Sequence, residues 1–109
     1  MRKVLYVVLK NNSEAYEILQ NLKNEGFNGT LIGSNSLKHT MDVFPEEHHF
    51  LNLRHIEDSE SSDFILCMFV WEEDVIEVIR EKIRKATGNF KDVHGFMFSK
   101  RVEDYEGTL

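Results

Sequence analysis

The chain has 109 residues, 41% of them hydrophobic and 29% charged, which is the balance of one soluble globular domain. Its formal net charge of −6 argues against nucleic acid as a partner, because no Lys/Arg cluster is strong enough to overcome repulsion from phosphate. The single cysteine, Cys67, lies in the apolar run FILCMFV, which predicts a buried and inert thiol in a reducing cytoplasm. No stretch is long enough to span a bilayer.

The first half of the chain predicts a strand, a helix and a second strand. The β-branched and aromatic run Lys3 to Leu9 is typical of a strand inside a sheet. Asn11 to Ser13 supplies helix-capping side chains, and Gly26 is placed to end the helix in a left-handed conformation. A second strand begins over Gly29 to Ile32. The apolar stripe of the predicted helix consists of Ala15, Ile18, Leu19 and Leu22.

The second half repeats this plan. Asp63 to Trp71 is the most apolar segment and predicts a central strand. The acidic run Glu72 to Asp74 favours the start of a second helix, which Thr87-Gly88 ends. Gly95 to Ser99 predicts the fourth strand, and Arg101 to Leu109 reads as a polar tail with one aromatic residue. The apolar face of the second helix consists of Val75, Ile76, Ile79, Ile83 and Ala86.

A duplicated strand–helix–strand unit of this size predicts an α+β fold of the ferredoxin-like βαββαβ type. Its four-stranded antiparallel sheet would carry both helices on one face and leave the other face uncovered. Apolar residues occur in both alternation phases of the strands, so other copies of the chain are expected to cover the open face. The residues that indicate this are Tyr6, Val8, Ile65, Cys67, Phe69, Phe96 and Phe98.

The segment Gly33 to Ser62 is a long polar insertion between the second and third strands. It carries four of the five histidines and the only proline. Insertions of this length inside a compact domain are uncommon unless they are functional or disordered. The sequence therefore places the function in or beside this segment.

The order of elements and several local strings resemble the PII-like signalling superfamily, and this resemblance covers nearly the whole chain, residues 1–109, as one domain. The strings are GTLIGSNSL before the insertion, KATGNFKDVHGFMF around the end of the second helix, and RVEDYEG near the close of the chain. The closer likeness is to short PII-like proteins of Firmicutes, a branch without a settled activity. The resemblance implies a homotrimer with a long T-loop, here about residues 36–62.

Two departures from the PII pattern bear on function. The tyrosine that is uridylylated in PII proteins is missing from the insertion, since the three tyrosines lie at Tyr6, Tyr16 and Tyr105. The turn after the second helix lacks the run of glycines that lets backbone N–H groups close on a triphosphate.

The resemblance implies a ligand site between subunits, where the base of the T-loop meets the turn after the second helix of a neighbour. Donors and positive charge there would suit an adenine nucleotide or another small anion. The same residues have simpler roles in shaping a turn and ending a helix. The candidate ligand-binding residues are Asn35, Ser36, Lys38, Thr87, Gly88, Lys91, His94 and Gly95.

The histidines of the insertion allow a different hypothesis, a divalent-metal site like that expected of the CutA divalent-cation tolerance proteins, which share the subunit plan. Zinc, copper and nickel favour imidazole ligands. Adjacent histidines on an extended chain point apart, however, and no HxH or HxxxH pair occurs, so the spacing favours a solvated, flexible loop over a metal site. The candidate metal ligands are His39, His48, His49 and His55.

The insertion also holds an apolar string that can pack on the body of the trimer or dock on a protein target. Its main members are Phe44, Phe50 and Leu53, with Arg54 as a polar anchor. No catalytic motif or dinucleotide glycine pattern occurs, so the sequence does not predict an enzyme. It predicts a cytoplasmic PII-like regulatory protein that senses a small-molecule effector; a CutA-like metal-binding trimer and a structural interaction module remain open.

Overall fold

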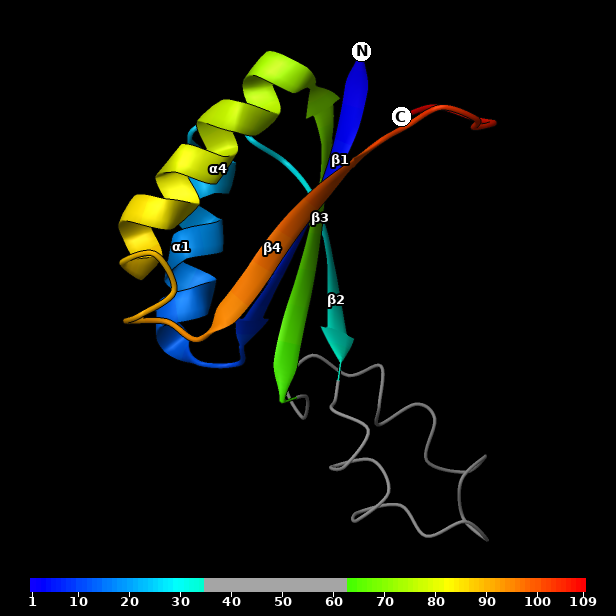
Figure 1. Ribbon diagram of the computed structural model, residues 1–109. Helices are drawn as coiled ribbons and strands as arrows, with labels where there is room; N and C mark the ends of the chain where they lie inside the picture. Colours follow the sequence, from blue (N-terminus) through cyan, green and yellow to red (C-terminus); the bar gives the residue numbers. More distant parts are fainter. Residues whose placement is uncertain (35–62) are drawn as a thin grey trace, which may run out of the picture.

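A computed structural model describes residues 1–34 and 63–109. In this part of the chain the elements follow the order β1 (Arg2–Lys10), α1 (Ser13–Asn24), β2 (Thr30–Ser34), β3 (Phe64–Glu72), α4 (Glu73–Thr87) and β4 (Gly95–Arg101). The strands form one antiparallel sheet in the order β2-β3-β1-β4. Both helices lie on the same side of it (Figure 1). The fold is therefore α+β, and the strand order is compatible with the predicted ferredoxin-like arrangement.

Both helices end as the sequence predicts. The Asn12 side chain accepts a hydrogen bond of 2.9 Å from the Ala15 N–H and caps the start of α1. At the other end, Gly26 has a φ of +97°, and the Phe27 N–H donates to the Leu22 carbonyl at 2.9 Å. Gly88, with a φ of +60°, ends α4 in the left-handed conformation. These glycines satisfy carbonyls that the last helical turns would otherwise leave unpaired.

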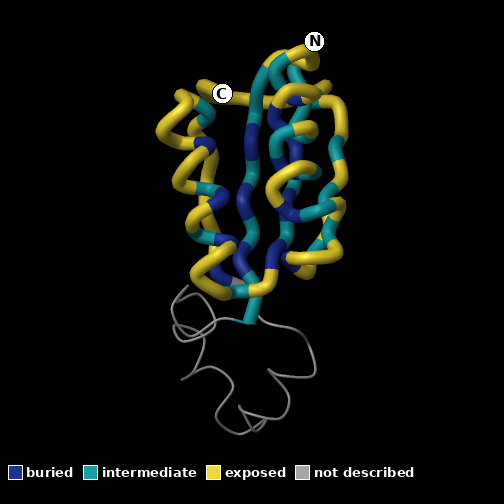
Figure 2. Tube along the Cα trace, turned by 90° about the vertical axis from the view of Figure 1, so that its left-hand side faces the viewer, coloured by how far each residue is buried: buried dark blue, intermediate teal, exposed yellow. Residues whose placement is uncertain are grey.

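The core lies between the sheet and the two helices. Alternate residues of β1 and β3 are buried against the helices, and these buried positions run along the strands behind the helices in Figure 2. The apolar face of α4 holds Ile76, Ile79 and Ile83, all fully buried. The prediction for Ala86 was wrong, because Ala86 is exposed and Thr87 is the buried residue one turn after Ile83.

β2 is longer at its far end than the sequence indicates. Gly33 and Ser34, expected to start the insertion, belong to β2 because they pair with Ile65 and Phe64 of β3. Strand pairing here outweighs the turn-forming tendency of Gly and Ser. Residues 35–62, which include the predicted T-loop, lie outside the described residues.

The opposite face of the sheet is apolar and carries no helix in the described part of the chain (Figure 1). Tyr6 of β1 and Phe98 of the edge strand β4 stack on this face with ring centroids 4.9 Å apart, and Phe96 lies beside Phe98 at 6.3 Å. Phe96 and Phe98 are 55% and 45% exposed. We call this surface the open face. By strand register Thr30 and Lys100 also lie on it, and its apolar residues are Val4, Tyr6, Val8, Ile32, Phe64, Leu66, Met68, Val70, Phe96 and Phe98.

Of the seven residues that suggested an uncovered apolar face, the register places Tyr6, Val8, Phe96 and Phe98 on the open face. Ile65, Cys67 and Phe69 point to the helices and belong to the core. Both faces of the sheet are therefore apolar, as the pattern indicates. Neither α1 nor α4 is long and apolar enough to cross a membrane.

Candidate functional site

The base of the insertion and the turn after α4 lie at the same end of the sheet. The Lys10 N–H donates to the His94 carbonyl at 2.9 Å, and the Asn11 N–H donates to the Asp63 carbonyl at 2.8 Å. The end of β1 is thus hydrogen-bonded both to His94, which precedes β4, and to Asp63, which precedes β3. Since β3 pairs with Ser34 of β2, the last described residue before the insertion and the turn after α4 lie at the same end of the sheet.

Within one chain, however, the end of β2 and the turn after α4 lie at opposite edges of the sheet. β2 and β4 are separated by β3 and β1. Neighbouring strands are about 4.8 Å apart, so three spacings place Ser34 about 14 Å from the start of β4. Within one chain, a ligand in contact with both sheet edges would have to span about this distance.

The turn after α4 is built around the buried hydroxyl of Thr87. Thr87 is 0% exposed, donates to the Ile83 carbonyl at 2.8 Å and accepts from the Phe90 N–H at 3.1 Å. After Gly88, both Asn89 and Phe90 also have positive φ, +57° and +64°. The Thr87 side chain holds the positive-φ backbone of this turn in place and does not reach solvent. Thr87, although a candidate ligand-binding residue, therefore has a structural role.

The remaining residues of the turn include both a positively and a negatively charged side chain, Lys91 and Asp92. A Cβ on Gly88 would collide with the Asp92 carboxylate, which therefore lies against this glycine. Lys91 and His94 are exposed and can meet a ligand, whereas Gly95 pairs with Leu9 of β1. An anion bound here would need Lys91 to offset repulsion from Asp92.

The other predicted site residues fall outside the described residues. These are Asn35, Ser36 and Lys38 of the ligand set, Phe44, Phe50, Leu53 and Arg54 of the partner set, and the metal candidates His39, His48, His49 and His55. In residues 1–34 and 63–109 no group of three His, Cys, Asp or Glu side chains is placed to hold a metal ion.

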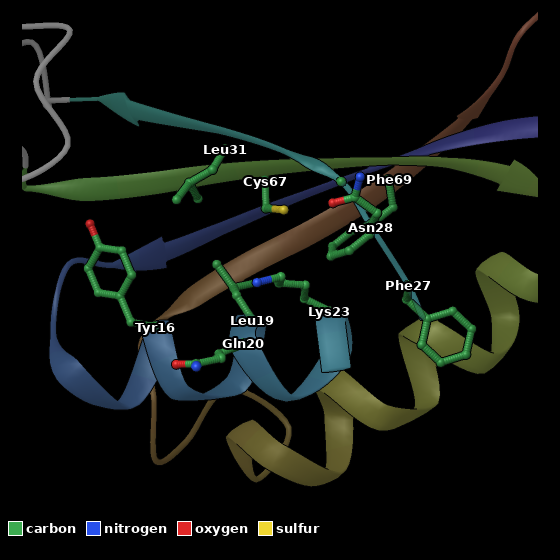
Figure 3. Close-up of a pocket in the computed structure, with 10 residues that line it drawn as sticks. Tyr16, Leu19, Gln20, Lys23, Phe27, Asn28, Leu31, Cys67 and Phe69 are labelled. Carbon is green, nitrogen blue, oxygen red and sulfur yellow. The ribbon is translucent and has the colours of Figure 1, made fainter. Parts of the chain in front are cut away.

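The sequence did not reveal a cavity of about 250 Å³ between α1 and the β2 edge of the sheet. Figure 3 shows Leu19 and Lys23 of α1 facing Leu31 of β2 and Cys67 of β3. Phe69 contributes to the apolar floor, and Tyr16, Gln20, Lys23 and Asn28 add polar atoms. We call this feature the α1–β2 cavity. The one signal in the sequence was the spacing of Tyr16, Leu19, Gln20 and Lys23, which places all four on one helix face.

Cys67 of this cavity is buried, as predicted, and burial raises the pKa of its thiol to about 11. In the unfolded chain the thiol ionises near 9.0, so between pH 9 and 11 the unfolded state loses this proton first. The folded state is therefore expected to lose stability as the pH rises through this window. Urea unfolding of the natural chain and of Cys67→Ala across pH 8 to 11 measures this; equal pH slopes for the two proteins would contradict it.

The structure thus defines the chain as a small α+β protein with an apolar open face and a strand order compatible with a ferredoxin-like fold. The end of β2 and the turn after α4 lie at opposite edges of its sheet. Compared with known proteins, the chain matches no protein-family model and no curated protein sequence.

Proposed function

We propose that this chain is the subunit of a homotrimeric, PII-like regulatory protein that binds a small-molecule effector in the clefts between subunits. The observation that carries the proposal is the open face, whose apolar residues span all four strands. A contiguous exposed apolar surface of this kind is typical of a protein–protein interface. Burying it among copies of the chain would leave the helices outside and bring sheet edges of different copies together.

The split of the candidate residues supports a ligand site at the subunit boundary. Lys91 and His94 approach from the β4 edge of one copy, and Asn35, Ser36 and Lys38 follow the β2 edge of another. Together they offer positive charge and amide and hydroxyl groups, which suits the phosphates of an adenine nucleotide. Because the Asp92 carboxylate lies against Gly88 and would repel an anion, we expect the ligand not to contact this glycine.

In this proposal the effector acts by selecting one arrangement of the T-loop, and no covalent step occurs. The loop would then present Phe44, Phe50, Leu53 and Arg54 to a target protein in the cytoplasm. The protein would act as a sensor, and not as an enzyme.

Two measurements on the purified chain test the proposal. Light scattering is expected to give a mass three times that of one chain, and a monomer would contradict the trimer. A thermal-shift screen against adenine nucleotides is expected to raise the melting temperature, because a ligand specific to the folded state stabilises it.

Substitutions then test whether the nucleotide binds at the turn after α4. Lys91→Ala is expected to reduce the nucleotide shift, whereas Lys85→Ala, an exposed lysine on α4 before the turn, is a matched control that should keep it. No shift with any nucleotide would contradict the effector class. A shift with zinc or copper alone, lost in His48→Ala plus His49→Ala, would favour the CutA-like alternative instead.

A further inference from the structure

The tail after β4 packs on no surface formed by residues 1–34 and 63–109, the part of the chain that the structure describes. The Val102 N–H donates to the Arg2 carbonyl at 3.1 Å, and every residue from 103 to 109 is exposed. Tyr105 and Leu109 are 56% and 43% exposed. In Figure 1 the tail leaves the sheet on the side away from the helices. An extended segment that exposes an aromatic and an aliphatic side chain is suited to binding another surface.

The α1–β2 cavity offers a surface of the matching kind. β2 is an edge strand, with β3 as its strand neighbour in the described part of the chain, so its outer N–H and C=O groups are open to another strand. The cavity volume of about 250 Å³ falls below the roughly 300–1,000 Å³ of pockets for drug-sized ligands. This size favours one large side chain over a whole metabolite.

The chemistry of the two surfaces is complementary. The tail sequence VEDYEG places Tyr105 among Glu103, Asp104 and Glu106. The cavity has an apolar floor that includes Phe69, and Lys23 at its edge forms no ion pair within the described residues. A tyrosine buries its ring and needs a partner for its hydroxyl, which the Gln20 and Asn28 amides can supply. The acidic neighbours of Tyr105 would lie near the Lys23 ammonium.

The tail cannot fill the cavity of its own chain. β4 and β2 lie at opposite edges, about 14 Å apart by three strand spacings. The four residue-to-residue steps from Arg101 to Tyr105 reach at most about 14 Å when fully extended. That reach is used up in crossing the sheet. The tail leaves the sheet on the side away from the helices (Figure 1), so it would also have to pass around the β2 edge to reach the cavity, which lies on the helix side over β2 and β3. The tail must therefore come from another molecule.

We propose that the tail of a second copy of this chain lies in the groove between α1 and β2, with Tyr105 in the α1–β2 cavity. Each copy then gives its tail to one neighbour and receives a tail from another. Such a head-to-tail contact forms a closed ring when its rotation allows closure, which is compatible with three subunits. The inference rests on the self-association in the proposed function, but it does not depend on the effector.

Cys67 makes a direct test possible, because it is the only cysteine of the chain and lines the cavity. The natural chain is co-expressed with a tagged Tyr105→Cys plus Cys67→Ser variant, so that each chain carries one thiol, at different positions. Oxidation with diamide is expected to join a natural chain to a tagged chain through a disulfide, seen on a non-reducing gel and assigned by mass spectrometry of the linked peptides. Moving the introduced cysteine to Lys100, on β4, is the matched control and should give little of this product.

A second measurement uses Leu31, which lines the same cavity and is 44% exposed in the isolated chain. In a Leu31→Cys plus Cys67→Ser chain, the tail would cover the introduced thiol. Adding Tyr105→Ala is therefore expected to raise its alkylation rate by iodoacetamide at least several-fold, whereas adding Tyr105→Phe should leave it nearly unchanged. A trimer by light scattering with neither the mixed disulfide nor the alkylation change would overturn the tail contact and leave the proposed function standing. A monomer would overturn both.

Discussion

Phe98→Asp is expected to convert the assembly into single chains. Phe98 lies on the open face, in the edge strand β4, stacked on Tyr6 of the neighbouring β1 at 4.9 Å, and is 45% exposed in the isolated chain. In an oligomer closed over this face, the new carboxylate would be buried without a partner. An unpaired buried charge costs about 3–5 kcal/mol, which corresponds to at least a hundredfold weaker association per subunit. Light scattering at micromolar concentration measures the change directly.

Val78→Asp is the matched control for this experiment. Val78 is an apolar residue of α4 with nearly the same exposure, 46%, but it lies on the helix layer, on the other side of the molecule from the open face. The same change in charge there should leave the mass of the assembly unchanged. Circular dichroism spectra that match the natural chain would show that both variants fold. An unchanged mass for Phe98→Asp would contradict burial of the open face between copies.

Much of the fold could be predicted because its signals are local in the sequence. The capping side chain of Asn12 and the glycines at 26 and 88 fix the helix ends within a few residues of themselves. The long apolar runs of β1 and β3 identify the two central strands, since only strands buried on both faces are apolar throughout. The duplication of the strand–helix–strand plan then restricts the strand order to very few possibilities.

The errors concern features that depend on tertiary contacts. Ala86 and Thr87 differ by about 100° around α4, and only packing against the sheet decides which of them is buried. The hydroxyl of Thr87 is also satisfied inside the core, by the Ile83 carbonyl and the Phe90 N–H, so its polarity gave a misleading signal. Gly33 and Ser34 similarly become strand residues through their pairing with β3.

The same distinction applies to the candidate site: its local features could be predicted from the sequence, and its tertiary features could not. Lys91 and His94 could be placed in an exposed turn from the sequence alone, because a helix end and a strand start define that turn. The α1–β2 cavity could not, since it combines Lys23 of α1 with Leu31 of β2 and Cys67 of β3, residues that only the folded chain brings together.

Gly95→Ala is expected to lower the free energy of unfolding by about 2–4 kcal/mol, within the range of severe overpacking. Gly95 pairs with Leu9 of β1, and an added Cβ would collide with the Val8 carbonyl oxygen and lie 3.0 Å from the Leu9 Cα. Both are backbone atoms of a central strand, so they cannot turn away as a flexible side chain could. The start of β4 would have to separate from β1.

Urea unfolding at fixed protein concentration measures this loss, with the fluorescence of the single tryptophan, Trp71, as the probe. Gly107→Ala is the control, because an added Cβ there meets nothing within 4 Å and the tail can relax its backbone. A Gly95→Ala variant as stable as the natural chain would contradict this close approach of β4 to β1. Gly95 is also one of the candidate ligand-binding residues. If Gly95→Ala binds a nucleotide more weakly, the reason would be displacement of the Lys91–His94 turn, and not the loss of a contact between the ligand and the glycine.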